Sequence, residues 1–203
     1  KDNPPVYSLP PVISSIDYSP DGALIAVSGY HEVLLHHADG SGLAARLIGL
    51  SERVQKVKFS PDGKKLAVSG LREITIWDSV TGELQRRIPG MAQRTYALAW
   101  SQDGGALTAG GGIPGELGEA RVFDAMTGKL KVVTHQAGDV VLDVQYDVNG
   151  TLLAVADADN FITVYHTDDF STRLRIDNHS DWVMAVTFSP DIRFLASASR
   201  DRS

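Results

Sequence analysis

Short apolar runs separated by polar turns recur along the whole chain, and none shows sustained helical spacing. In the first complete unit, a strand-like stretch over residues 13–18 leads into a turn, and residues 24–27 form an unbroken apolar run. Such a run is typical of a strand covered on both faces. Residues 33–35 form a third run, and residues 43–47 alternate as in a half-exposed outer strand. The pattern predicts four short strands in each unit and an all-β chain.

A turn motif marks the repeat. Ser19-Pro20-Asp21-Gly22 returns 41 residues later as Ser60-Pro61-Asp62-Gly63, and altered copies begin at Ser101, Asp147 and Ser189. Proline fixes φ and glycine accepts positive φ, so both suit a tight turn. A period of this size is typical of stacked copies of one supersecondary unit, none of which buries its apolar face alone. We therefore expect a single domain over residues 1–203, with repeats at roughly 9–49, 50–90, 91–134, 135–177 and 178–203, the last of them partial.

The composition narrows the possible functions. Of the 203 residues, 43% are hydrophobic and 22% are charged, which is ordinary for a soluble globular protein. The net charge of −6 gives no general attraction to nucleic acid or anionic lipid. No apolar run reaches the roughly 18–20 residues that span a bilayer. The lack of cysteine excludes disulfides, thiolate zinc sites and cysteine nucleophiles. We expect no cofactor, no nucleic-acid partner and no membrane insertion.

A dipeptide closes the third predicted strand of several units. It is Trp77-Asp78 in the second unit and Phe123-Asp124 in the third, while His36-His37 and Tyr165-His166 depart from it. Together with the turn motif and the period, this set resembles the WD-repeat β-propeller family. The resemblance implies four complete four-stranded blades and a partial fifth, packed around a central channel. Most relatives close with about seven or eight blades, so the resemblance also implies the N-terminal part of a larger propeller. Val6-Tyr7 would then end a strand that completes the final blade.

Several short segments are similar to a group of bacterial WD-repeat proteins found in planctomycetes and related bacteria. These segments are residues 5–7, 28–36, 49–53, 181–183 and 199–203. Members of the group often carry a c-type cytochrome domain before the propeller and are thought to be exported. The resemblance therefore implies a companion domain and a periplasmic location, whereas the composition alone leaves a cytoplasmic location open. No cytochrome motif lies in these residues.

The fifth unit combines His179, Ser197, Ser199 and Asp201, which suggests a hydrolase. No strand-turn-helix nucleophile elbow accompanies them, however. The resemblance implies a structural role instead, because WD repeats use His, Ser or Thr, Asp and Trp as a hydrogen-bonded tetrad within each blade. Such a network pairs polar groups that would otherwise be buried alone.

Other units hold parts of the same tetrad-like set. Trp77, Asp78 and Asp159 belong to it, whereas Arg72 and His31 replace the turn aspartate in the second and first units. We expect those two units to lack the network and to rely on apolar packing.

Two further motifs favour structural interpretations. The glycine-rich segment 110–118 lacks the terminal Lys-Ser/Thr of a phosphate loop and precedes a strand, so a lengthened hairpin loop is favoured. Such loops on rigid scaffolds often bind partners. His36 and His37 point to opposite faces of a strand, and the odd spacing of His31 and His36 also disfavours a shared metal ion.

Two recurrent positions are the candidates for binding. One lies seven residues before each turn motif and is occupied by Val12, Arg53, Arg94, Val140 and Trp182. The other lies beside the turn between the second and third strands and is occupied by Tyr30, Leu71, Ala158 and Arg200. The resemblance implies that both face one rim of the channel, where partners dock. Tryptophan, tyrosine and arginine are enriched at binding hot spots, although Trp182 packed down onto its own blade is the alternative.

The sequence thus predicts a non-catalytic protein-interaction scaffold that binds a partner protein or a companion domain. The candidate residues are Arg53, Arg94, Trp182, Arg200, Tyr30 and Leu71, together with the segment 111–118. One alternative is a structural or electron-transfer support domain of a larger exported protein with a c-type cytochrome. Another is an enzyme with an active site at the channel mouth. The inner-strand positions are mostly Ala, Val, Leu and Ser and offer no convergent titratable set for catalysis.

Overall fold

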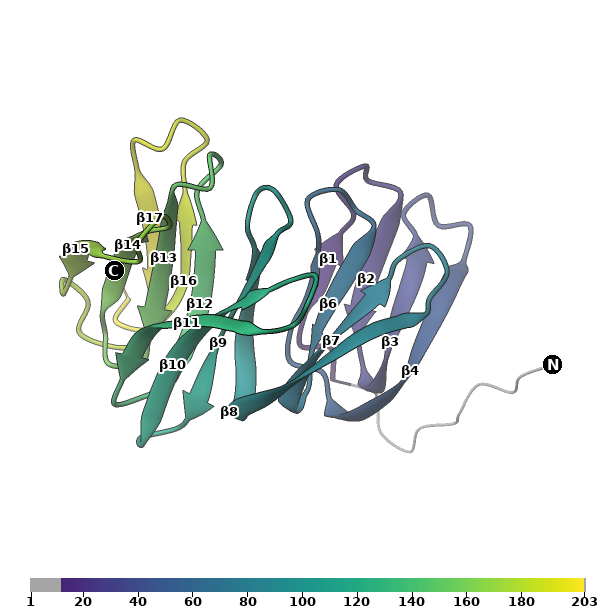
Figure 1. Ribbon diagram of the computed structural model, residues 1–203, viewed down its shortest axis with the longest axis horizontal. Helices are drawn as coiled ribbons and strands as arrows, with labels where there is room; N and C mark the ends of the chain where they lie inside the picture. Colours follow the sequence, from purple (N-terminus) through teal and green to yellow (C-terminus); the bar gives the residue numbers. More distant parts are fainter. Residues whose placement is uncertain (1–11, 203) are drawn as a thin grey trace.

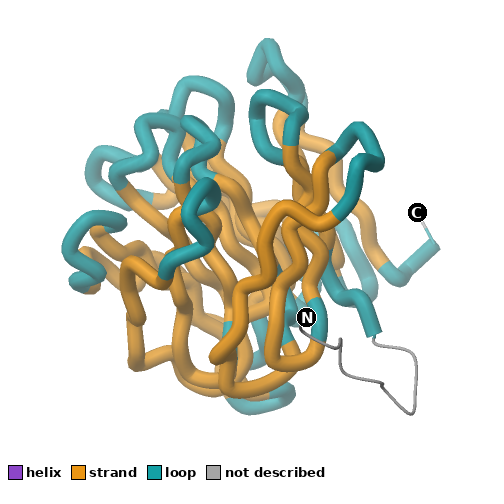
Figure 2. Tube along the Cα trace, turned by 90° about the vertical axis from the view of Figure 1, so that its right-hand side faces the viewer, coloured by secondary structure: helices purple, strands orange, loops and turns teal. Residues whose placement is uncertain are grey.

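The computed structural model describes residues 12–202, and all regular structure in this range is β-strand (Figures 1 and 2). The predicted all-β class is confirmed. The prediction for Val6-Tyr7 lies outside the described residues. Within residues 12–202 there is no helix of a length and hydropathy that could cross a bilayer.

The strands form antiparallel sheets in chain order, and each four-stranded unit is a blade. Blade 1 consists of β1 (Ile16–Tyr18), β2 (Leu24–Ser28), β3 (Tyr30–His37) and β4 (Leu43–Arg53). Blade 2 consists of β5 (Val57–Phe59), β6 (Lys65–Ser69), β7 (Leu71–Asp78) and the first half of β8 (Leu84–Trp100).

The later strands continue this series. Blade 3 consists of the second half of β8 with β9 (Ala106–Ile113), β10 (Leu117–Asp124) and β11 (Leu130–Ala137). Blade 4 consists of β12 (Val141–Tyr146), β13 (Leu152–Asp157), β14 (Ile162–His166) and β15 (Thr172–Ile176). A fifth unit follows with β16 (Val183–Phe188) and β17 (Leu195–Ser199). Figure 1 shows these units side by side along the molecule.

One strand serves two blades, which the sequence did not predict. The outer strand of blade 2 and the inner strand of blade 3 are the continuous strand β8, so these blades form one seven-stranded sheet. Arg94 pairs with Leu71 of blade 2 and also with Gly112 of blade 3. The connection between blades 2 and 3 is thus an extended backbone that pairs with β7 on one side and with β9 on the other, and no loop interrupts β8.

The repeated turn motif is held by its own side chains. In the second copy, Ser60 Oγ donates to Asp62 Oδ1 at 2.6 Å and accepts the Lys65 N–H at 2.9 Å. Asp62 Oδ1 also accepts the Lys64 N–H at 3.1 Å, and Gly63 has a φ of 71°. Serine and aspartate thus hold the turn through hydrogen bonds, and glycine adopts the positive φ of its last residue without strain.

The core lies between blades. Four apolar clusters occupy the successive interfaces, and each draws side chains from two neighbouring units. The inner-strand residues Val57, Leu98, Val144 and Val186 are at most 3% exposed, because the preceding blade covers each of them. Ile16, at the equivalent position of blade 1, is 56% exposed, and no described residues form a preceding blade. Burial therefore depends on the neighbouring unit.

Side chains also join the inner strands of neighbouring blades. An inner strand is the edge of its sheet, so some of its N–H groups lack a strand partner. The Phe59 N–H donates to Asp17 Oδ2 at 2.7 Å, and the Val186 N–H donates to Asp143 Oδ2 at 3.0 Å. Trp100 Nε1 donates to the Lys58 carbonyl at 3.0 Å. These bonds fix the inner strands around the central hollow.

Candidate functional site

Backbone hydrogen bonds divide the strand connections between two ends of the molecule. At one end, the turn between a blade's first two strands bonds to the turn between its last two, as in Ser79 N–H to the Lys64 carbonyl at 3.1 Å. We call this the turn end. At the other end, the second turn bonds to the connection between blades, as in Arg200 N–H to the Trp182 carbonyl at 3.1 Å. We call this the rim, and it carries Tyr30, Arg53, Leu71, Arg94, Trp182 and Arg200.

Trp182 and Arg200 form a contact at the rim of the fifth unit. Trp182 stands one residue before β16 and Arg200 one residue after β17. The Arg200 guanidinium carbon lies 4.7 Å from the Trp182 ring centroid, which is a cation–π distance. Trp182 is 36% exposed, and Arg200 is exposed. Part of the indole therefore packs down, and part of it remains accessible.

The same positions in blades 1 and 2 also come together. Tyr30 is the cross-strand partner of Arg53, and Leu71 is the cross-strand partner of Arg94. Tyr30 is 51% exposed, Arg94 is exposed, and Arg53 and Leu71 are half-buried. Arg53 Nε donates to Ser14 Oγ at 3.0 Å.

Blade 4 differs from the others at the rim. Its residues at the two recurrent positions, Val140 and Ala158, are buried. The Ala158 N–H donates to the Val140 carbonyl at 2.9 Å, so these residues close the blade and present no side chain to solvent.

The turn end is rich in ionised carboxylates. Hydrogen bonds from a neighbouring serine side chain or a threonine backbone N–H hold the pKa of eight aspartates below the ordinary value, because they favour the charged form. These aspartates are Asp21, Asp39, Asp62, Asp78, Asp103, Asp124, Asp169 and Asp191.

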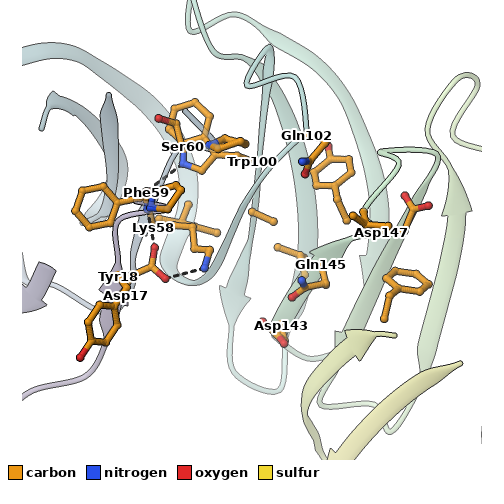
Figure 3. A pocket seen from close by; sticks show the side chains of 18 of the residues that line it. Asp17, Tyr18, Lys58, Phe59, Ser60, Trp100, Gln102, Asp143, Gln145 and Asp147 are labelled. Atoms are coloured by element: carbon orange, nitrogen blue, oxygen red, sulfur yellow. Dashed lines mark hydrogen bonds and ion pairs between the residues drawn. The ribbon is translucent and has the colours of Figure 1, made fainter. Parts of the chain in front are cut away.

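A hollow of about 610 Å³ lies against the inner strands, and its wall carries titratable side chains (Figure 3). Lys58 Nζ lies 2.8 Å from Asp17 Oδ1. Lys56 and Asp143 also line the hollow. Burial raises the pKa of the Asp143 carboxyl, an effect opposed by the bond from the Val186 N–H. The sequence did not indicate this set.

The bonds made by these charged side chains indicate that they connect neighbouring inner strands. Asp17 and Asp143 accept backbone N–H groups of the next inner strand, and Lys58 pairs with Asp17. Only the alignment of inner strands across blades brings them together. The available signal in the sequence was the charged residues that stand shortly before successive turn motifs.

The histidine network of the fifth unit forms around Ser197. His179 Nδ1 lies 2.8 Å from Asp201 Oδ2, and His179 Nε2 lies 2.7 Å from Ser197 Oγ. Ser199 Oγ instead donates to the Asp181 carbonyl at 2.9 Å. Ser199 ends β17 and faces the connection, so its predicted membership of the set needs correction. The network links the start of the unit to its second strand and second turn.

Sequence reasoning missed a network that joins the outer strand of blade 3 to blade 4. His135 Nδ1 lies 2.8 Å from the Tyr165 hydroxyl, and His135 Nε2 lies 3.1 Å from Asp157 Oδ2. All three residues are buried. Asp159 contacts no histidine here and accepts the Gly138 N–H at 2.6 Å. The hydroxyl-bearing Tyr165 at the dipeptide position was the signal for an altered network.

Blades 1 and 2 have no such histidine–aspartate pair but do have polar contacts. Trp77 Nε1 donates to Thr75 Oγ1 at 2.8 Å, within the same strand. Asp78 Oδ1 accepts the N–H groups of Val80 and Thr81 and caps the hairpin turn, so it is not part of a tetrad.

For these two blades, apolar packing was predicted to replace the network. Ion pairs are present in addition to this packing. Glu73 pairs with Arg87 at 2.8 Å, and Glu32 pairs with Arg46. Each pair joins the third strand of its blade to the fourth, which is a second way to fix these strands.

The glycine-rich segment is mostly strand, which corrects the predicted long loop. Residues 110–112 belong to β9 and pair with β8 and β10. A Cβ on Gly111 would lie 2.0 Å from the Arg94 carbonyl oxygen, and one on Gly118 would lie 1.8 Å from that of Asp139. Glycine is needed because backbones approach closely. Only residues 113–117 remain partly or fully exposed for contact.

The histidines of blade 1 do not converge. His31 Nδ1 lies 3.1 Å from the Leu50 carbonyl oxygen, while His36 is half-buried and His37 is exposed. Across residues 12–202, no three histidine, aspartate or glutamate side chains are grouped as metal ligands.

Comparison with known proteins follows the repeat. Residues 128–166 and 171–203 match the WD40 family, described as "WD domain, G-beta repeat". These two stretches make up about a third of the chain. A solved structure titled "Crystal Structure of Mitotic Checkpoint Complex" superposes with a TM-score of 0.82 and 22% identity, covering 92% of this chain and 56% of that chain. The likeness shows the WD40-type propeller arrangement of the blades.

Curated relatives match a shorter region. Echinoderm microtubule-associated protein-like 4 is 36% identical over 85 residues in both Homo sapiens and Xenopus laevis, which is 39% of this chain and 9% of those proteins. WD repeat and SOCS box-containing protein 1 of Homo sapiens is 28% identical over 88 residues, or 42% of this chain and 21% of that protein. The chain thus matches only a small part of each relative's length.

Proposed function

We propose that this WD40 chain is a non-catalytic protein-interaction scaffold that uses its rim to bind a partner protein. WD-repeat proteins generally act as scaffolds of this kind. The observation that carries the proposal is the Trp182–Arg200 pair, an aromatic side chain and a guanidinium that remain accessible on a rigid frame. Such pairs supply large contact area and directional hydrogen bonds at hot spots.

The frame supports this function physically. The inner strands are tied across blades by side-chain hydrogen bonds, and the interfaces are apolar and buried. Residues at the ends of such strands keep fixed relative positions. Binding then requires little ordering of the scaffold, which favours affinity.

The test is a paired capture experiment. The immobilised chain is incubated with cell extract of the source organism, and captured proteins are quantified for the wild type and for Trp182→Ala/Arg200→Ala. The control is Phe194→Ala/Arg193→Ala, because Phe194 is 66% exposed and Arg193 lies over its ring, at the turn end of the same unit. We expect the rim variant alone to lose capture, with both melting curves close to wild type. Equal capture by the two variants would reject the rim.

We also propose that these blades are part of a larger ring. The supporting observation is the uncovered face of blade 1, where Ile16 and Tyr18 are exposed at positions that are largely buried in other units. The intact mass and reading frame of the parent protein test this, and a parent without further repeats would reject it. The bacterial group, the companion cytochrome domain and the electron-transfer alternative stay predictions.

A further inference from the structure

A basic patch covers the rim of blades 1 and 2. It consists of Tyr30, Arg53, Leu71, Arg72 and Arg94. Tyr30 pairs with Arg53, and the same arrangement returns 41 residues later as Leu71 with Arg94. The repeat therefore places two equivalent residue pairs in neighbouring blades, and each pair has one arginine next to an aromatic or apolar side chain.

The arginines of the basic patch have no carboxylate partner within residues 12–202. No ion pair there includes Arg53, Arg72 or Arg94. Two glutamates of the same blades are engaged by other arginines, since Glu32 pairs with Arg46 and Glu73 pairs with Arg87. The three arginines of the basic patch thus carry positive charge without a described ion pair, on a chain whose net charge is −6.

One of these arginines stands in an unfavourable backbone conformation. Arg72 has a φ of 59° and is exposed. His31, in the same turn of blade 1, has a φ of 65°, so this conformation belongs to the turn between the second and third strands. The turn places the exposed Arg72 side chain next to Leu71 at the rim.

Acidic residues elsewhere restrict the basic patch to blades 1 and 2. Asp139, Asp159 and Asp181 lie at the rim of blades 3 to 5. Each accepts backbone N–H groups from its own connection or from a neighbouring turn. The turn end carries the eight ionised aspartates described above. Because the three rim carboxylates lie at blades 3 to 5, an anionic partner is attracted to the basic patch more than to that part of the rim.

We propose that the basic patch binds an extended, acidic segment of a protein partner. The inference rests on the proposed scaffold function and names the class of partner. A guanidinium can bind a carboxylate through two parallel hydrogen bonds, which gives direction as well as charge. The exposed Tyr30 adds a flat contact surface next to Arg53.

The experiment uses the full chain and a short fluorescein-labelled peptide composed of Glu, Asp, Tyr, Gly and Ser, with a lysine-for-acid version as the counter-probe. Fluorescence anisotropy gives the affinity at low and physiological salt. The test variant is Arg72→Asn/Arg94→Gln, in which asparagine tolerates the left-handed backbone. The matched control is Lys64→Gln/Lys129→Gln, which removes the same charge from exposed positions at the turn end.

We expect the acidic peptide to bind and the basic peptide not to bind. The patch variant should bind about tenfold more weakly, because each exposed pair contributes on the order of 0.7 kcal/mol and about 1.4 kcal/mol is a factor of ten. The control should retain wild-type affinity. Equal weakening in both variants would mean nonspecific charge attraction and would overturn the proposal, as would preference for the basic peptide.

The two proposals fail in different ways. If the acidic peptide does not bind while Trp182→Ala/Arg200→Ala still abolishes partner capture, the basic patch is wrong and the scaffold function stands. If the rim variant captures as much as its control, the scaffold function itself is rejected. Melting curves identify any variant that has lost its fold.

Discussion

Gly110→Ala tests whether blades 3 and 4 pack as tightly as the structure indicates. Gly110 lies in β9, and a Cβ there would lie 2.5 Å from Cγ1 of Val141 and 3.1 Å from Cγ1 of Val144. Both valines belong to β12 of the next blade and are at most 2% exposed. Optimal carbon–carbon contacts are about 3.5–4.0 Å, so the new methyl group overlaps Val141 by about 1 Å.

The magnitude follows from this overlap. Overpacking of a well-filled core costs about 1–3 kcal/mol, and the loss of glycine's freedom in the unfolded chain returns about 0.4–1 kcal/mol. The net expectation is a loss of about 1–2 kcal/mol. For a domain of this size that corresponds to a fall in Tm of about 2–8 °C.

A double-mutant cycle assigns the effect to the interface. Val141→Ala alone should cost about 2 kcal/mol through lost burial and the cavity it leaves. The new methyl group of Gly110→Ala occupies part of that cavity. The double variant should therefore be more stable than the sum of the single losses by about 1–2 kcal/mol.

Thermal and urea unfolding of the four proteins give the coupling. Gly105→Ala is the control, because the atom nearest to a Cβ added at this exposed glycine is Oδ2 of Asp103, at 3.2 Å. Its effect should stay within about 0.5 kcal/mol. Strict additivity of Gly110→Ala and Val141→Ala would refute the packing of β9 against β12.

Three further predictions concern the turns and the hollow. Gly22→Ala should cost about 1 kcal/mol in unfolding experiments through backbone strain alone, because φ is 71° and nothing lies within 4 Å of the added Cβ; no loss would contradict this. Asp143 has a raised pKa, so its stabilising protonated form is lost as the pH rises from the ordinary value of 3.8 through the folded value. The Tm of Asp143→Asn should therefore equal or exceed that of the wild type at pH 7, and this difference should disappear in acid. A lower Tm than the wild type at neutral pH only would contradict the burial argument. Asp62 has a lowered pKa through Ser60, so it stabilises the fold above the unfolded pKa and loses this effect as the pH falls through the folded value. Asp62→Asn should lower Tm at pH 7, and its Tm should approach that of the wild type in strong acid. A difference in Tm that does not change with pH would show that the Asp62 charge is not the cause.

The sequence could predict what depends on local chemistry. The turn motif recurs because four of its five copies make the same bond, from the serine hydroxyl to the aspartate two residues later. The predicted runs at residues 24–27 and 33–35 lie within β2 and β3. The family match covers residues 128–166 and 171–203, so part of the WD40 resemblance has independent support.

What the sequence could not predict depends on neighbouring units. Asp17 and Lys58 are 41 residues apart, and only the close approach of two inner strands makes them an ion pair. The glycines at 110–112 read as a loop, because the backbone atoms that exclude a Cβ come from other strands. His135 bonds to Tyr165 across two blades, which its position in the repeat did not indicate. The binding roles of the rim residues stay predictions.

Amide hydrogen exchange at the inner strands tests the central claim, the packing of successive blades around the hollow, most directly. The N–H groups of Phe59 and Val186 lie on sheet edges and are bonded only because Asp17 and Asp143 of the preceding blades accept them. The account predicts that both amides exchange about as slowly as the Val68 amide inside β6, and that Asp17→Ala selectively releases Phe59. Rapid exchange of both amides in the wild-type chain would show that the blades do not meet in this way.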